Sequence, residues 1–229
     1  MFCPRETSLG LMSIAFREQI RTEVTGRSQA NALNIQKMRL ETAAGKEFEF
    51  MVKMLTRGSS SRFSLPAAYA ARAMTETAQL GYSNVVRKLV GFGVNPSVQG
   101  RRRETALHIF SHKGDAAMVR FLLDHGAVVD ARDQDSSTPL HWGAWAGNLD
   151  AARELLARRA DINAVDKDGR TALFGAAGGG FTDVVRLLLL RGADKQLPGG
   201  TRKETPLDRA VKRKQEAVVR LLQGDDAAP

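Results

Sequence analysis

His108 and His112 are the residues whose types and spacing come nearest to metal chemistry. On a helix, residues four apart share one face, where two imidazoles can ligate a cation. The single cysteine, Cys3, excludes a Cys-rich zinc site. His108 also belongs to a tetrapeptide that repeats along the chain, so its presence is part of the repeat pattern, and His112 is then the one histidine of the pair that the repeat does not account for. We therefore expect no metal site and no cofactor.

Sequence signatures of common active sites are missing from the chain. It contains no G-x-x-x-x-G-K-[ST], no G-x-S-x-G, no H-E-x-x-H and no C-x-x-C motif. The glycine cluster between Gly175 and Gly180 does not fit a phosphate cradle, because no strand is predicted before it and no lysine follows in place. We therefore predict a non-enzymatic protein without catalytic residues.

The composition is that of an ordinary globular protein, with 43% hydrophobic and 26% charged residues and a formal net charge of +9. No apolar run approaches the roughly 18–20 residues that cross a bilayer. The first residues mix arginine with glutamate and match neither a secretory signal nor a transit peptide. One cysteine gives no disulfide framework. We therefore expect an intracellular protein, in the cytoplasm or nucleus, that is not secreted and has no transmembrane segment.

The elements that would position a site follow from an internal repeat. Four tetrapeptides begin with threonine, have leucine third, and start 33, 33 and 34 residues apart: Thr105–His108, Thr138–His141, Thr171–Phe174 and Thr205–Asp208. Apolar pairs and closing glycines repeat in phase. Threonine can cap a first short helix, the apolar pairs form the stripe of a second, and glycine suits its end. Such short helix pairs bury their apolar faces only by stacking on neighbours.

This pattern resembles ankyrin repeats in its period, in the T-[PA]-L-H tetrapeptide, and in the L-L-x-x-G-A-D ending at Leu188–Asp194. The resemblance implies an all-α fold, an ankyrin-repeat solenoid of stacked helix-turn-helix units joined by hairpin-like loops. The expected units are residues 67–99, 100–132, 133–165, 166–199 and 200–224 of a 67–224 repeat domain.

The remaining segments are less regular. Residues 38–66 are expected to form either a degenerate cap or a partial repeat, because Phe48, Met51, Val52 and Leu55 have helical apolar spacing. Residues 1–37 are predicted to be an N-terminal extension, partly helical or disordered, and residues 225–229 a tail.

Ankyrin repeats imply a protein–protein interaction module that binds through a concave groove and its loop tips. Transferred position by position, the expected partner-binding residues on the tips are Arg101, Arg102, Glu104, Gln134, Asp135, Ser137, Lys167, Asp168 and Arg170. Those on the first helices are His112, Lys113, Trp145, Gly178 and Gly179. We expect the partner to be another protein, and an acidic protein is one option. We expect the chain itself to be a monomer.

Trp145 has two interpretations. An indole exposed in a groove is a frequent interface hot spot. Alternatively, the ring packs within the chain, in space left beside Gly178 of the following unit.

Two other functions are left open: a targeting or regulatory subunit of an enzyme, and a basic surface for nucleic acid or anionic membrane. The basic surface is disfavoured, because the basic tips at Arg101–Arg103 and Arg202–Lys203 lie three units apart with mixed charges between them.

Departures from the repeat are also informative. Arg159 replaces the closing glycine of the third strong unit, so we predict that this arginine has a left-handed backbone conformation. The glycine cluster should make the first helix of the next unit less stable than the other first helices. Arg209, Lys212 and Arg213 fit the wetted outer face of a terminal repeat.

Overall fold

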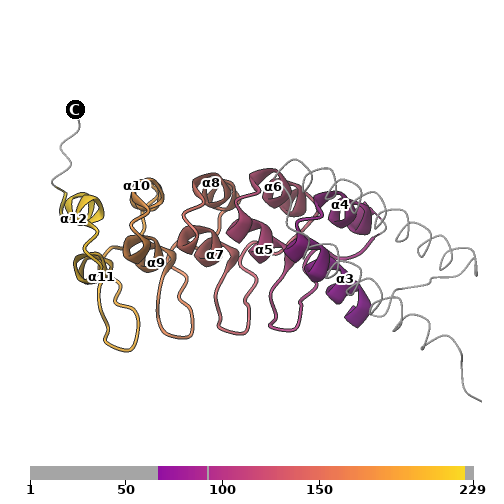
Figure 1. Ribbon diagram of the computed structural model, residues 1–229, viewed down its shortest axis with the longest axis horizontal. Helices are drawn as coiled ribbons and strands as arrows, with labels where there is room; N and C mark the ends of the chain where they lie inside the picture. Colours follow the sequence, from indigo (N-terminus) through magenta and orange to yellow (C-terminus); the bar gives the residue numbers. More distant parts are fainter. Residues whose placement is uncertain (1–66, 92, 225–229) are drawn as a thin grey trace, which may run out of the picture. The chain divides into compact units, whose positions relative to one another are not determined.

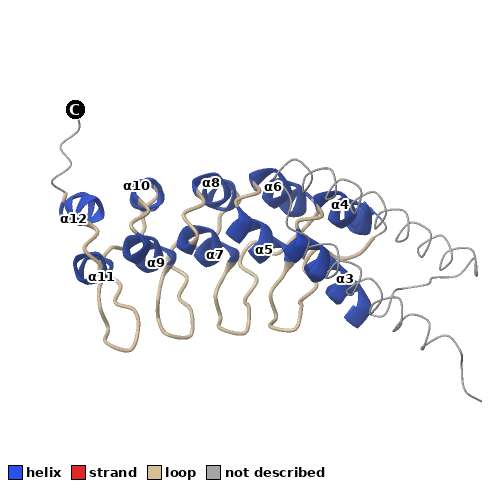
Figure 2. Ribbon diagram, in the orientation of Figure 1, coloured by secondary structure: helices blue, strands red, loops and turns tan. Residues whose placement is uncertain are grey.

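The computed structural model describes residues 67–91 and 93–224, so the predicted extension, cap and tail at 1–37, 38–66 and 225–229 lie outside the described residues. Within the described ranges the chain forms ten helices and no strand (Figure 2). The helices are α3 (Ala67–Leu80), α4 (Ser83–Gly91), α5 (Ala106–Lys113), α6 (Ala116–Asp124), α7 (Pro139–Trp145), α8 (Leu149–Ala157), α9 (Ala172–Gly179), α10 (Thr182–Leu190), α11 (Pro206–Lys212) and α12 (Glu216–Gln223).

The helices form antiparallel pairs that stack in chain order. In Figure 1, α3, α5, α7, α9 and α11 lie in one row, here called the first-helix row. Helices α4, α6, α8, α10 and α12 lie in a second row, and the long loops project from the side of the first-helix row. The predicted all-α repeat solenoid is confirmed, while the exact limits of each unit stay a prediction.

The core runs between the two rows and repeats with the sequence. Leu122, Leu155 and Leu188 occupy equivalent places on α6, α8 and α10, and each has 0% of its surface exposed. Each of these side chains is buried by its own pair and by the adjacent pairs, which is the mutual dependence expected of a solenoid.

Histidines of the tetrapeptide join neighbouring units. The backbone N–H of Thr105 donates to Nδ1 of His108 at 3.2 Å, which assigns the ring proton to Nε2. Nε2 then donates to the carbonyl oxygen of Ser137 in the next unit at 3.0 Å. His141 repeats the arrangement, with its Nε2 2.9 Å from the carbonyl oxygen of Arg170. At each of two successive junctions, a buried histidine therefore joins adjacent units by a hydrogen bond.

Arg159 has a left-handed backbone with φ of 61°, as the register predicts. Gly126 and Gly192, at the equivalent ends of α6 and α10, have φ of 85° and 88°. A left-handed conformation costs an L-residue with a side chain roughly 1–2 kcal/mol, and glycine adopts it freely.

Replacing Arg159 with glycine is therefore expected to raise the free energy of unfolding by about 1 kcal/mol. Chemical denaturation followed by circular dichroism measures the change. Gly192→Arg is the matched reverse variant and should lower the stability, because a Cβ there meets no atom within 4 Å and only the backbone conformation is affected. An unchanged or reduced stability of Arg159→Gly would contradict this explanation.

Candidate functional site

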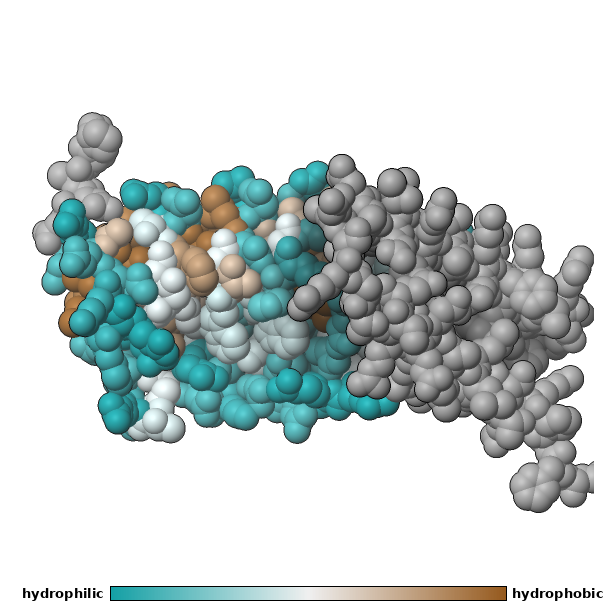
Figure 3. Space-filling model, viewed as in Figure 1, coloured by the Kyte–Doolittle hydropathy of each residue, from teal (hydrophilic) through white to brown (hydrophobic). Residues whose placement is uncertain are grey.

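The loop tips form a ladder of backbone hydrogen bonds between adjacent units. The N–H of Gln134 donates to the oxygen of Arg102 at 2.8 Å, and that of Lys167 to the oxygen of Asp135 at 2.9 Å. The N–H of Gly200 donates to the oxygen of Asp168 at 2.8 Å. This edge of the described part is mostly hydrophilic (Figure 3). The tips are therefore held in register, and their side chains project from one joined surface.

Charges on the central tips are largely paired across units. Asp135 accepts from Lys167 at 2.5 Å and lies 3.5 Å from Arg102. The hydrogen bond from Lys167 lowers the pKa of the Asp135 carboxyl. Arg170 contacts Asp168 at 2.9 Å. Cations and carboxylates thus alternate at the centre of the tip surface, which does not form a continuous basic stripe there.

Glu104 was expected to be an exposed tip residue, and this prediction is wrong because its side chain is buried, with 6% of the residue exposed. Its carboxylate accepts from the N–H of Arg102 at 2.7 Å. In the next two units, buried Asp133 and Asp166 accept from loop N–H groups in the same way. Gly100 occupies the equivalent position in the earlier unit, so Glu104 folds back to supply the missing carboxylate.

Ser137 was also expected to face a partner, but only 1% of it is exposed. Its N–H donates to Asp133 at 2.8 Å, and its carbonyl oxygen accepts from His108. Ser137 therefore connects two units and presents no side chain to the outside.

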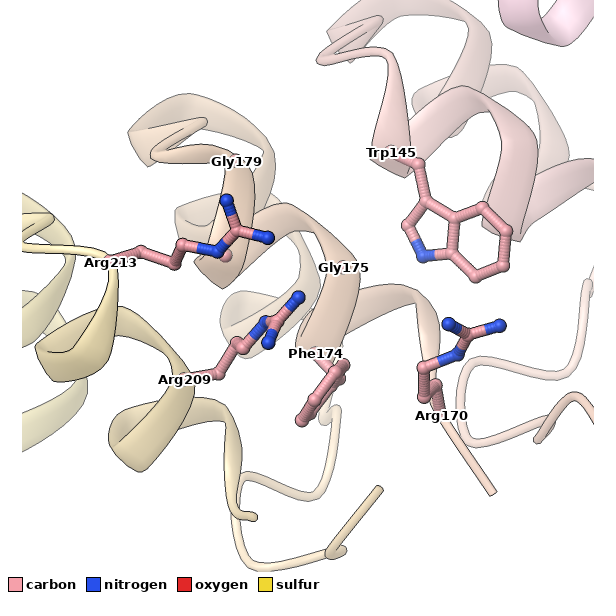
Figure 4. Close-up of a pocket in the computed structure, with 8 residues that line it drawn as sticks. Trp145, Arg170, Phe174, Gly175, Gly179, Arg209 and Arg213 are labelled. Carbon is pink, nitrogen blue, oxygen red and sulfur yellow. The ribbon is translucent and has the colours of Figure 1, made fainter. Parts of the chain in front are cut away.

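Side chains from three first helices and one loop surround a pocket of about 330 Å³. Four of its residues were predicted from the sequence and four were not (Figure 4). We call it the Trp145 pocket, and it is lined by Trp145, Arg170, Phe174, Gly175, Gly178, Gly179, Arg209 and Arg213.

Trp145 forms one wall of the pocket by packing on α9. A Cβ built on Gly175 would lie 1.6 Å from Cδ1 and 1.8 Å from Nε1 of the indole, so the ring fits only because this residue is glycine. The sequence prediction placed the space beside Gly178, whereas the nearest atoms to a Cβ there belong to Arg209, at 3.1 Å. The Trp145 ring therefore packs within the chain, against Gly175 in place of Gly178.

Three arginines surround the same pocket. Arg170 lies with its guanidinium carbon 5.4 Å from the Trp145 ring centre, and its charge is offset by Asp166 and Asp168 at 2.8 and 2.9 Å. Arg209 lies 5.4 Å from the Phe174 ring centre. Arg213 ends the same helix and is exposed. Arg209 and Arg213 were assigned only to a terminal surface by sequence, although they follow Gly175 and Gly179 by one repeat of 34 residues.

The other predicted site residues lie elsewhere on the surface. His112 and Lys113 are exposed at the end of α5, and Arg101 and Gln134 are exposed on the tips. None of the four lines the Trp145 pocket. Among residues 67–91 and 93–224, no group of three or more metal-ligating side chains is arranged to hold an ion.

A family model for ankyrin repeats (3 copies) matches residues 74–166 and 158–228. No curated protein matches the chain. None of the helices in the described part combines the length and apolar character needed to cross a membrane. The matched residues contain every residue that lines the Trp145 pocket.

Proposed function

Because the chain belongs to the ankyrin repeat family, whose members are generally protein–protein interaction modules without enzymatic activity, we propose that this protein binds a partner protein through its first-helix row and loop tips. The observation that supports this most is the pocket of about 330 Å³ across α7, α9 and α11. It combines an aromatic wall with arginine side chains, and Trp and Arg are the residues most often found as interface hot spots.

The joined tips support the same proposal. A surface held in register by hydrogen bonds between units loses little conformational entropy when a partner binds. Alternating charges at Asp135, Lys167 and Asp168 would orient a protein partner. They disfavour nucleic acid, whose phosphates would meet carboxylates on adjacent tips. An intracellular location and a monomeric state remain predictions.

Affinity capture with matched variants tests this function. Trp145→Ala and Arg101→Ala alter the pocket and the tips, while Arg220→Ala alters an exposed residue on α12 of the second row. We expect a bound protein that the first two variants retain less well than the wild type, and that Arg220→Ala retains fully. Circular dichroism must show that each variant is folded. Equal capture by all three variants would contradict binding through this surface.

A further inference from the structure

We propose that the Trp145 pocket binds a carboxylate of an acidic peptide segment in the partner protein. This inference rests on the proposed function and specifies the chemistry of one subsite. The argument comes from two guanidinium groups, from glycines of α9 that let the lining side chains lie close to the helix, and from a buried indole N–H that has no acceptor among the described residues.

Arg209 and Arg213 place two positive charges on the same side of the pocket. They are four residues apart at the end of α11, a spacing at which like charges repel. Figure 4 shows both side chains directed over α9, opposite the indole of Trp145. One carboxylate between them would relieve the repulsion and accept charge-assisted hydrogen bonds.

The existing acidic groups leave this charge only partly compensated. Glu204 lies 3.7 Å from Arg209 but 2.5 Å from Lys212, so its carboxylate is shared. Within residues 67–91 and 93–224, Arg213 has no ion-pair partner. The positive charge of Arg170, in contrast, is compensated by two aspartates. Its side chain lines the pocket beside the indole.

Glycines of α9 make room for the side chains that line the pocket. At Gly178 a Cβ would lie 3.1 Å from Cγ and Nε of Arg209, so a larger side chain would push the guanidinium out of its place. Glycine inside a helix is less favourable than alanine, yet α9 contains Gly175, Gly178 and Gly179. These glycines allow the side chains that line the pocket to lie directly against the α9 backbone.

The indole of Trp145 adds an unsatisfied donor. Its Nε1 is buried and has no hydrogen-bond partner among the described residues. A buried donor without an acceptor destabilises the folded chain. In Figure 4 the nitrogen is on the side of the ring that faces α9 and the arginines. A carboxylate oxygen in the pocket can accept this hydrogen only when the indole turns away from Gly175, against which Nε1 packs.

The surroundings favour a peptide carboxylate over a polyanion. Asp168 belongs to the adjacent tip, where 35% of its side chain is exposed, and Asp135 lies on the tip before it, with 32% exposed. A chain of phosphates extending from the pocket would meet these carboxylates. An isolated acidic side chain with apolar neighbours would instead place its carboxylate on the arginines and its apolar part against Trp145 and Phe174.

Binding of acetyl-Ala-Leu-Glu-Leu-Ala-amide, a peptide with one acidic residue between apolar ones, to the full chain tests the proposal, and the indole N–H resonances report it. The chain has two tryptophans, and Trp142 provides the reference because its Nε1 donates to Asp133 at 2.9 Å. At low ionic strength we expect the peptide to shift the Trp145 resonance and not the Trp142 resonance. The matched peptide acetyl-Ala-Leu-Gln-Leu-Ala-amide should shift neither.

Arg213→Gln should weaken binding of the acidic peptide at least fivefold, because it removes one charge-assisted contact. Arg220→Gln makes the same change in net charge on α12 and should weaken binding less than twofold. No Trp145 shift, or equal weakening by both variants, would overturn the carboxylate subsite. Tighter, Arg213-dependent binding of a heparin hexasaccharide would overturn it in favour of a polyanion site.

This titration needs no cellular partner, so its failure is distinct from failure of the proposed function. If the peptide does not bind but Trp145→Ala and Arg101→Ala still reduce partner capture, only the subsite is wrong. If the peptide binds but no partner depends on the first-helix row, the proposed function is wrong.

Discussion

Gly175→Ala is expected to lower the free energy of unfolding by about 1–3 kcal/mol in the wild-type chain, because the new Cβ overlaps the Trp145 ring. The built Cβ lies 1.6 Å from Cδ1 of the indole, far inside van der Waals contact. Either the ring leaves α9 or the two helices separate. Both outcomes remove packing from the junction between α7 and α9.

The sign should reverse when Trp145 is already alanine. The clash is then absent, and replacing glycine by alanine inside α9 should raise the free energy of unfolding by roughly 0.5–1 kcal/mol through helix propensity. Urea denaturation of the four proteins of this double-mutant cycle, followed by far-ultraviolet circular dichroism, measures the coupling between the two residues.

Gly178→Ala is the matched control on the same helix. Its Cβ would lie 3.1 Å from the side chain of Arg209, a flexible chain that can move aside. Its effect on stability should therefore be the same whether residue 145 is tryptophan or alanine. A Gly175→Ala variant that is equally stable in both backgrounds would show that the indole does not pack against α9 at this glycine.

The helices and their stacking could be predicted from the sequence, because the period fixes which residues are buried. Leu122, Leu155 and Leu188 fall in equivalent buried places since threonine, leucine and glycine recur at constant spacing. The same spacing predicted the left-handed backbone of Arg159.

The side-chain directions at the tips could not be predicted in this way. The position of a residue in the repeat predicts where its backbone lies. The rotamer of its side chain also depends on whether a nearby residue lacks a hydrogen-bonding group. Glu104 turns inward because Gly100 supplies no carboxylate, a fact that only the folded loop makes visible. Arg103 and Lys203 likewise adopt positive φ at the place where Gly169 does, although neither residue type suggests it.

The candidate site was predicted in part for a related reason. Trp145 was predicted because its residue type is a frequent interface hot spot, and Arg170 because its position in the repeat falls on a loop tip. The pocket between these two residues and Arg209 depends on contacts between neighbouring units. At the junction of α9 and α11, Phe174 replaces the histidine of the tetrapeptide, so no imidazole bridges to the next unit. A pairwise comparison of each position with its equivalent one repeat later would have indicated Arg209 and Arg213.

The histidine bridges predict a steep loss of stability between pH 7 and pH 5. Burial lowers the pKa of His108 and of His141 below the ordinary value of 6.5. Protonation of either ring would also place an Nδ1–H against the N–H of Thr105 or Thr138, which now donates to that nitrogen. The folded protein therefore keeps both rings neutral while the unfolded chain takes up protons.

The sign follows from linkage. Where the unfolded state binds more protons, stability increases with pH, so the contribution is complete above about pH 6.5 and is lost as the pH falls below it. Each histidine adds a slope of up to about 1.4 kcal/mol per pH unit, and the two together up to about 2.7. Carboxylates with ordinary pKa values near 4 titrate below this window. Free energies of unfolding measured at several values between pH 5 and pH 7 give the slope.

His141→Gln separates this effect from general acid destabilisation. Glutamine at the third helical position can still pair with the capping threonine, but it does not titrate. The variant should therefore lose about half of the slope, whatever its stability at pH 7. His108→Gln should remove the other half, so the double variant His108→Gln, His141→Gln should lose most of the slope. If the double variant keeps the slope of the wild type, the pH dependence does not originate at the buried histidines, and the neutral bridges do not account for the loss of stability.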